Sequence, residues 1–364
     1  MIKGAGSLRK ILPSQEQSFE WEPMEKGLSV LICSHNGAAR IEQTLDHLAR
    51  QVFEESISWE IVLVDNASTD GLEQKAVSSW SSNVPLRVIR EPRLGVTYAR
   101  ITGMNHCRYA YIGFIDDDNW ASPDWVERAF HAIDSKPDAG AVGGANMAVF
   151  ETEPPVWFER YSRNYAVGEQ YETNGIVEKP DGMLWGAGLV LRNEAWQQLV
   201  SLGYDPLIQS RTGKSLMSGE ETEILLSFKL LGWNLYYDKQ LKLEHYIPCQ
   251  RMTWKYHLRL RRGLGAASVY LDLYRSLLAW SQTGVDLKNE TWSKSINKLL
   301  LAIIKDPFAI LASPFARFEG NYRIARYHFL LGALRERIAR GPQIDKISAD
   351  LFVKVISWPL GKRM

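Results

Sequence analysis

The sequence predicts an α/β protein in which a doubly wound, mainly parallel sheet is followed by a helical region. From residue 28 to about residue 145, short apolar runs alternate with amphipathic segments. This alternation is typical of parallel strands joined by right-handed helical crossovers. After about residue 251 the alternation stops and long helical segments follow. We therefore expect three parts: an N-terminal extension (1–26), an α/β unit (27–250) and a basic helical region (251–364).

Continuous apolar runs predict the strands of the first half, at residues 28–33, 60–65, 85–90, 110–115 and 140–145. Apolar side chains at helical spacing predict the helices between them, at residues 41–51, 72–80, 96–107 and 123–135. Ser122 and Pro123 are expected to be the N-cap and the first residue of the last of these helices.

Farther along the chain the pattern is less regular. The aromatic and acidic stretch at residues 151–180 is expected to form loops over the open end of the sheet. Residues 183–191 predict a further strand, and residues 241–244 are strand-like. Residues 220–231 predict a helix that Gly232 ends.

The last third of the chain is basic and helical. Helices are predicted at residues 254–278, 292–304 and 322–339. Residues 251–364 carry 20 Lys and Arg against 8 Asp and Glu, whereas residues 1–250 carry 23 against 34. A basic surface of this kind favours an anionic partner, either nucleic acid or a membrane surface.

A membrane surface fits the apolar segments of this region better than nucleic acid does. Residues 299–315 are apolar but are interrupted by Lys305, Asp306, Pro307 and Pro314. The segment is too broken to span a bilayer, yet it fits a helix pair lying in the interface. Alternatively, these helices pack on the α/β unit and bury their apolar stripes there. No nucleic-acid-binding motif is found, so we expect no nucleic acid partner.

The N-terminal residues and the cysteines indicate a cytoplasmic protein. Residues 1–26 are polar, contain two prolines and lack the apolar core of a signal peptide. The three cysteines are widely spaced and show neither a zinc pattern nor a disulfide framework, which fits a reducing compartment. We expect a cytoplasmic protein with a peripheral contact on the inner face of the plasma membrane.

Three consecutive carboxylates, Asp116, Asp117 and Asp118, follow the predicted strand at residues 110–115. They would lie at the carboxyl end of that strand, where open α/β sheets bind ligands. Like charges packed this closely repel, and burying them unpaired costs several kcal/mol or forces protonation. A bound Mg²⁺ or Mn²⁺ would remove this problem and complete its ligand shell with substrate phosphates. The alternative is a solvated acidic turn.

Polar residues also follow the first two predicted strands. Ser34 opens a turn of small and polar residues after the first strand, and Asp65 and Asn66 precede a Ser/Thr/Asp turn after the second. A carboxylate at Asp65 can accept a hydrogen bond from the imide of uracil or thymine, or from a guanine edge. Asp70 in the second turn is as suited to capping a helix as to contacting a ligand. Each motif alone is common in α/β proteins.

Together, and in this order and spacing, the three motifs and the string Asp-Asp-Asp-Asn-Trp resemble the GT-A fold of the family 2 glycosyltransferases over residues 28–246. The resemblance implies an inverting, metal-dependent enzyme that uses a nucleotide-diphosphate sugar, linked to UDP, dTDP or GDP. It implies that Ser34 and Asp65 hold the nucleobase and that Asn66 belongs to the same stretch. Asp116 and Asp117 would face the ribose or a ligating water.

The resemblance also implies a metal site and a basic residue beside it. Asp118 corresponds to the metal ligand of the family, and His245 lies where related enzymes have a histidine that reaches the metal or the diphosphate. Arg100 ends a segment that is similar to one in the family, so it would approach the nucleotide or the acidic triplet. A structural ion pair is the alternative for Arg100, and a structural role is the alternative for His245.

In this family a general base comes from a Glu-Asp pair at the start of a helix, and residues 218–226 resemble that segment. The residue that matches the base is Glu221, where the family usually has Asp. The additional methylene moves the carboxylate by roughly an ångström, which affects the position of the acceptor. Glu220 is the alternative base. Both acids would also be typical of an ordinary first helical turn.

Trp185, Gly186 and Gly188 match a family loop that lies against the donor sugar and the acceptor. Glycines let a ligand approach the backbone, and Trp185 either stacks on a sugar face or packs in the core. A group of basic side chains is expected to screen the diphosphate, contact an anionic acceptor or remain solvated: Arg251, Lys255, Arg259, Arg261 and Arg262.

The acceptor implied by the resemblance is a saccharide or a lipid-linked saccharide of a surface polysaccharide pathway. A non-catalytic protein on the same fold, binding sugar nucleotides or carbohydrate, is the alternative function, because Glu stands at position 221.

Overall fold

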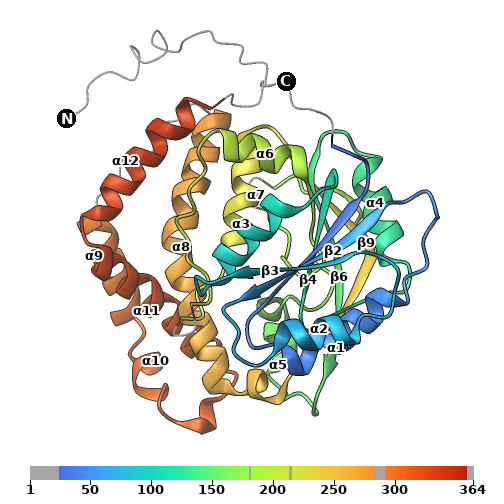
Figure 1. Cartoon of the computed structure of the whole chain (residues 1–364). Coiled ribbons are helices and arrows are strands. Elements are labelled where there is room, and N and C mark those ends of the chain that lie inside the picture. Colours follow the sequence, from blue (N-terminus) through green and yellow to red (C-terminus); the bar gives the residue numbers. More distant parts are fainter. Residues whose placement is uncertain (1–23, 180–181, 213–214, 284–291, 359–364) are drawn as a thin grey trace.

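The computed structural model describes residues 24–179, 182–212, 215–283 and 292–358 (Figure 1). The predicted N-terminal extension therefore lies almost entirely outside the described residues. A mixed sheet with strand order β3-β2-β1-β4-β8-β6-β9-β5 forms the centre of the α/β unit, and β7 pairs with β9.

The first half of this sheet is parallel, as predicted. Its strands are β1 (Leu28–Ser34), β2 (Trp59–Asn66), β3 (Leu86–Glu91) and β4 (Tyr111–Asp116). The helices after the first three strands are α1 (Ala38–Ala49), α2 (Leu72–Ser79) and α3 (Val96–His106). In the parallel register Ser34 lies opposite Asp65 and Cys33 lies opposite Asp116. The polar residues that follow the three strands therefore meet at one edge of the sheet.

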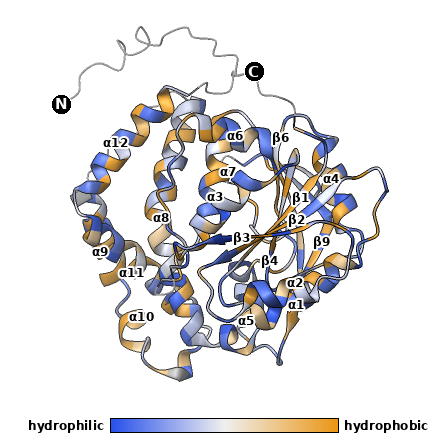
Figure 2. Ribbon diagram, viewed as in Figure 1, coloured by the Kyte–Doolittle hydropathy of each residue, from blue (hydrophilic) through white to orange (hydrophobic). Residues whose placement is uncertain are grey.

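Helices cover both faces of the sheet. Side chains of α1, α2 and α4 (Trp125–Asp134) pack in one core, and those of α3, α6 (Asn193–Ser201) and α7 (Glu220–Leu230) pack in the other. Figure 2 shows the central strands as largely apolar, which is expected of strands buried on both faces.

Beyond β4 the sheet departs from the simple parallel prediction. The short strand β8 (Val190–Arg192) runs antiparallel to both β4 and β6 (Ala139–Phe150). Strand β6 pairs in parallel with the long β9 (Asn234–Ile247), while β5 (Asn119–Ala121) and β7 (Gly175–Ile176) run antiparallel to β9. A register shift interrupts the β6–β9 pair beside Gly144, where a Cβ atom would lie 1.7 Å from the Leu241 carbonyl oxygen.

Two sequence predictions are wrong in this part of the chain. Most of the strand predicted at residues 183–191 is a loop, because Gly188 has φ +73 and turns the backbone before β8 begins. The N-cap of α4 is Asp124, so Trp125 rather than Pro123 is the first helical residue. The Ser122 hydroxyl donates instead to the carbonyl of Lys242 on β9, at 2.9 Å.

The stretch at residues 151–180 contains the short α5 (Phe158–Tyr161), a 3-10 turn (Ser162–Tyr165) and β7, and is otherwise irregular. The 3-10 turn Cys249–Met252 then leads into the helical region. Its helices are α8 (Trp254–Thr283), α9 (Trp292–Ile304), α10 (Pro307–Ala312), α11 (Tyr322–Arg340) and α12 (Gln343–Ile356).

Helix α8 joins the helical region to the α/β unit. Its buried side chains, including Ala267, Tyr270 and Leu271, belong to the same core as α7. Helices α8 and α11 touch through glycines, since a Cβ atom at Gly265 would lie 1.9 Å from a carbonyl oxygen of α11, and one at Gly332 would lie 2.0 Å from a carbonyl oxygen of α8. For α8 the alternative of a helix packed on the α/β unit is therefore correct. No helix in the described ranges combines the length and the apolar character needed to cross a bilayer.

Candidate functional site

A cleft of about 650 Å³ opens at the carboxyl ends of β1, β2 and β4. One wall carries the acid triplet, and another is formed by the start of α7 together with α8 and α11. Side chains at residues 163–170 and 183–187 complete the lining, which agrees with the loops predicted over the open end of the sheet. The cleft therefore lies between the α/β unit and the helical region.

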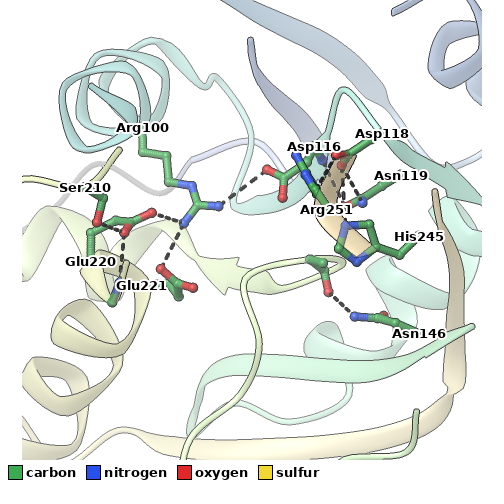
Figure 3. Close-up of polar contacts among 12 residues, drawn as sticks. Arg100, Asp116, Asp118, Asn119, Asn146, Ser210, Glu220, Glu221, His245 and Arg251 are labelled. Carbon is green, nitrogen blue, oxygen red and sulfur yellow. Dashed lines mark hydrogen bonds and ion pairs between the residues drawn. The ribbon is translucent and has the colours of Figure 1, made fainter. Parts of the chain in front are cut away.

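Each acid of the triplet is paired with an arginine from a different part of the chain, and Figure 3 shows the pairs of Asp116 and Asp118. The pairs are Asp116 with Arg100 at 3.5 Å, Asp117 with Arg40 at 2.9 Å, and Asp118 with Arg251 at 2.8 Å. Asp117 and Asp118 are buried, with 8% and 3% of their surface exposed, so the alternative of a solvated acidic turn is wrong. The three guanidinium groups offset part of the repulsion that a metal was expected to relieve.

These surroundings shift the pKa values of Asp117 and Asp118 in opposite directions. Burial and the repulsion of Asp118 raise the pKa of Asp117 above its usual range. Burial alone would also raise the pKa of Asp118, but the Arg251 guanidinium and then His245 outweigh it, so the pKa of Asp118 is lowered. Asp118 is therefore the stronger acid of the buried pair.

Asp118 and His245 form the part of the cleft that could hold a cation. Asn119 lies opposite His245 in the β5–β9 register, and the His245 Nε2 atom is 3.7 Å from Asp118 Oδ1. Burial lowers the pKa of His245, which favours the neutral imidazole that binds metals. The buried Nδ1 atom has no hydrogen-bond partner within the described residues.

One carboxylate and one neutral imidazole suit a divalent cation that takes its other ligands from a diphosphate. Among the described residues no third Asp, Glu, His or Cys joins the pair within ligand distance. The donor set therefore fits a cation that binds together with its substrate.

The residues expected at the nucleobase lie together beside this site. The Ser34 hydroxyl donates to Asp117 Oδ2 at 2.5 Å. Asp65 is 3% exposed and accepts hydrogen bonds from the Ser68 backbone N–H and the Arg90 guanidinium, at 2.9 and 2.8 Å.

Asn66 lines the cleft, but its amide is engaged by the backbone. The amide nitrogen donates to the carbonyls of Glu91 and Arg93, and the amide oxygen accepts the Gly95 N–H. Asn66 therefore braces the loop between β3 and α3.

On the opposite side, Arg100 joins the acid triplet to the start of α7 (Figure 3). Its guanidinium contacts Glu220 Oε1 at 2.7 Å and Glu221 Oε2 at 3.3 Å. Glu220 also accepts hydrogen bonds from the Ser210 hydroxyl and the Gly219 N–H. Arg100 therefore forms the structural ion pairs that were the alternative for this residue, and these pairs lie within the cleft.

The two glutamates differ in protonation because their partners differ. Burial alone would raise the pKa of Glu220, but Arg100 and then the Ser210 hydroxyl overcome it and lower the pKa. Burial and the repulsion of Glu220 raise the pKa of Glu221 to about 7. Glu221 therefore combines access to the cleft with a pKa suited to proton transfer near neutral pH.

A third acid of α7 connects this helix to the helical region. Glu223 is fully buried and accepts hydrogen bonds from the backbone N–H groups of Leu207 and Ile208 and from the Tyr274 hydroxyl of α8. Burial raises the pKa of Glu223 to about 7. This residue fixes both the preceding loop and α8 to the helix that carries Glu221.

The glycine-rich loop lies against these acids. A Cβ atom at Gly186 would be 3.2 Å from both Arg100 Nη2 and Glu221 Oε1, so only a bare backbone fits without a shift. Gly188 turns away toward Leu243 of β9. Trp185 is half-buried and lines the cleft, with the Arg163 guanidinium 5.7 Å from its ring centroid.

The sequence reasoning missed four arginines that line the cleft, Arg40, Arg163, Arg211 and Arg275. Arg40 lies in the first turn of α1, where a basic side chain is electrostatically unfavourable, and that position was an available signal. Arg211 lines the cleft from the loop before α7 and has φ +46, a backbone conformation that its sequence does not announce. Of the five basic residues proposed from the sequence, Arg251 contacts the acid triplet.

Comparisons with known proteins identify the family and the fold. Residues 29–199 match the family described as Glycosyl transferase family 2. The glucosyl-dolichyl phosphate glucuronosyltransferase of Haloferax volcanii is 22% identical over 223 residues, covering 60% of this chain and 68% of that protein. EpsJ of Bacillus subtilis, described as an uncharacterized glycosyltransferase, is 31% identical over 101 residues, only 28% of either chain.

A solved structure of similar fold is the mannosyltransferase PcManGT from Pyrobaculum calidifontis in complex with GDP-Man and Mn²⁺. The TM-score is 0.52 and the identity 16%, over 90% of this chain and 92% of that one.

Proposed function

Because this chain belongs to the family 2 glycosyltransferases and has their GT-A fold, we propose that it is an inverting, metal-dependent sugar transferase. The proposed donor is a sugar linked to a nucleoside diphosphate, with uracil, thymine or guanine as the base. The proposed acceptor is a hydroxyl of a saccharide or of a lipid-linked saccharide, in the synthesis of a surface polysaccharide. The relative named for action on a glucosyl-dolichyl phosphate supports an acceptor of the lipid-linked class.

The observation that carries this proposal is the difference between two neighbouring carboxylates at the start of α7, in their partners and in their pKa values. Glu220 is ionised and saturated by Arg100, Ser210 and the Gly219 N–H, which favours Glu221 over Glu220 as the base. Paired acids whose environments push their pKa values apart are typical of acid–base sites.

In the proposed step Glu221 accepts the proton of the acceptor hydroxyl as that oxygen bonds to the anomeric carbon. The bond from this carbon to the diphosphate oxygen breaks on the opposite face, and its electron pair leaves with the diphosphate. Gly186 lies beside Glu221 without a side chain, since a Cβ atom there would be 3.2 Å from Glu221 Oε1.

The leaving diphosphate needs positive charge, and the cleft supplies it in two forms. Asp118 and His245 would hold Mn²⁺ or Mg²⁺, whose chemistry when bound is to neutralise charge on the phosphate oxygens. Arg251 and Arg211 line the same part of the cleft, and guanidinium groups bind phosphate oxygens well. Ser34 and Asp65 are proposed to position the nucleobase.

A screen of nucleotide sugars tests the proposal. Thermal stabilisation by one donor in the presence of Mn²⁺ would identify it, because a ligand of the folded state raises apparent stability. Release of nucleoside diphosphate with an acceptor would then establish transfer. Strong stabilisation without turnover of any donor would favour a non-catalytic binding protein instead.

We also infer that the enzyme acts in the cytoplasm and contacts the inner face of the plasma membrane. The basic charge of residues 251–364 and a lipid-linked acceptor support this location. Recovery in the membrane fraction that depends on detergent would support it, and full recovery without detergent would oppose it.

A further inference from the structure

Large apolar side chains are exposed on the last turns of α9, on α10 and just after α10. Between 38% and 72% of the surface of each is exposed, and they form what we name the apolar edge: Leu300, Leu301, Ile304, Ile310, Leu311 and Phe315. In Figure 2, α10 is a largely apolar segment at the margin of the molecule, far from the sheet. Six large exposed apolar side chains within residues 300–315 favour an interaction site, whereas single exposed apolar side chains need no explanation.

A basic groove of about 480 Å³ borders the apolar edge between α9 and α11. Leu301 belongs to both surfaces. The charged side chains of the groove are Lys298, Lys305, Asp306, Arg323 and Arg326. Asp306 is paired with Arg323, so Lys305 and Arg326 give the groove its positive charge.

We propose that the apolar edge and the basic groove together form a docking surface for a bilayer that contains anionic phospholipids. Apolar side chains of interfacial helices enter the boundary between headgroups and acyl chains, while the adjacent cations attract lipid phosphates. The inference rests on the proposed function, because the bilayer is where a lipid-linked acceptor resides. It specifies the surface and the lipid charge that the proposed location requires.

The charge of the groove selects this partner over a second copy of the chain. A symmetric contact would bring two basic grooves face to face, and like charges at an interface repel. Anionic headgroups carry the complementary charge. An apolar edge that protrudes beside the cations is also unsuited to the polar backbone of a nucleic acid.

The docking surface is linked to the cleft through a single helix. Arg323 and Arg326 of α11 face the groove, and Phe329 lines the cleft three residues later, roughly 5 Å farther along the helix axis. A bilayer on this surface would therefore lie next to the wall of the cleft formed by α8 and α11. A lipid-linked acceptor could then reach Glu221 from that side, with the donor bound at the acid triplet opposite.

Vesicle flotation of the full chain tests the surface. We expect binding to vesicles of phosphatidylcholine with phosphatidylglycerol, weakening with salt, and little binding to phosphatidylcholine alone. Lys305→Gln and Arg326→Gln should each lower the partition coefficient about fivefold. The double variant Leu301→Ser/Leu311→Ser should lower it about tenfold or more.

The matched control is Val77→Ser, which alters an equally exposed apolar side chain on α2, at 59% exposure, and should bind like the wild type. Equal binding by the double variant and the wild type, or no binding by the wild type, would overturn the docking surface. Self-association of the wild type that the double variant abolishes, without vesicle binding, would identify a second copy as the partner.

Donor hydrolysis without acceptor separates this inference from the proposed function. The rate should be the same in the wild type and in all surface variants, because none of the substituted residues lines the cleft. Vesicle binding as expected, with no turnover of any donor, would leave the docking surface standing and refute the proposed function. Turnover without vesicle binding would refute the docking surface and leave the proposed function standing.

Discussion

Replacement of Arg100 by methionine tests the ionic network that joins the two sides of the cleft. The side chain of Arg100 is 7% exposed, and its guanidinium is the shared partner of Glu220, Glu221 and Asp116. At an effective dielectric constant near 20, two unit charges about 4 Å apart attract by about 4 kcal/mol. Removal of one partner from a buried pair typically costs about 3–5 kcal/mol, because the other charge remains buried.

We therefore expect Arg100→Met to lower the free energy of unfolding by about 3–5 kcal/mol above the pKa of Glu221, which lies at about 7. Arg100 lowers the pKa of both Glu220 and Glu221, so both values rise in the variant. The folded variant then binds more protons than the wild type, and its stability falls as pH rises. The cost of the substitution should accordingly shrink as the pH falls below about 7.

Urea unfolding, followed by tryptophan fluorescence at several pH values, measures this cost. Arg100→Lys is the control, because it keeps the charge but loses the planar fork, and it should recover part of the stability. A cost for Arg100→Met below about 1 kcal/mol, typical of an exposed pair, would refute the network. A cost that does not change with pH would refute the assignment of Arg100 to the two glutamates.

The remaining predictions concern the base, the metal and the loop beside them. Glu221→Gln should leave donor binding near normal by calorimetry while stopping nucleoside diphosphate release with acceptor; release at the wild-type rate would exclude Glu221 as the base. In the wild type the transfer rate should rise with pH through about 7 as Glu221 loses its proton, and a rate that falls over this range would contradict that role. Asp118→Asn should abolish Mn²⁺-dependent nucleotide binding. EDTA should not change the melting temperature of the free protein, because each acid of the triplet has an arginine partner. Gly186→Ala should lower kcat by about tenfold to a hundredfold, since the new methyl group would crowd Arg100 and Glu221, and an unchanged kcat would show that the acceptor lies elsewhere.

The parallel half of the sheet could be predicted closely because its strands are buried on both faces. Strands β1, β2 and β4 are continuous apolar runs, and the helices that follow them have regular apolar spacing. The second half could not be predicted in the same way. In β9 buried and partly exposed residues alternate along much of the strand, and only residues 241–244 were identified from the sequence. The loop at residues 183–189 resembles a strand in composition, and the turn at Gly188 is a property of its backbone.

In the site, too, the features formed by neighbouring residues could be predicted, whereas contacts between distant parts of the chain could not. The acid triplet is one short run of sequence, and the acids at the start of α7 are another. The place of each run at the edge of the sheet therefore followed from the order of the elements. The partners of these acids come from α1, α3 and the turn before α8, and no local pattern joins them. The repulsion within the triplet was correctly identified as a problem, but the counterions are arginines that only the tertiary structure brings together.

The contacts of α7 connect the proposed base to the helical region that carries the docking surface. Arg100 holds Glu220 from α3, and one turn later Glu223 is held by the Tyr274 hydroxyl of α8 at 2.8 Å. A shift of α8 must therefore either move the start of α7 or break a buried hydrogen bond to a carboxylate, which typically costs about 1.5–3 kcal/mol. Helix α8 is in turn in backbone contact with α11 at Gly265 and Gly332, with no space between them. It follows that docking of α11 on a bilayer would bear on the position of Glu221 as well as on the supply of acceptor. On the proposed function, the helical region would then help to position Glu221.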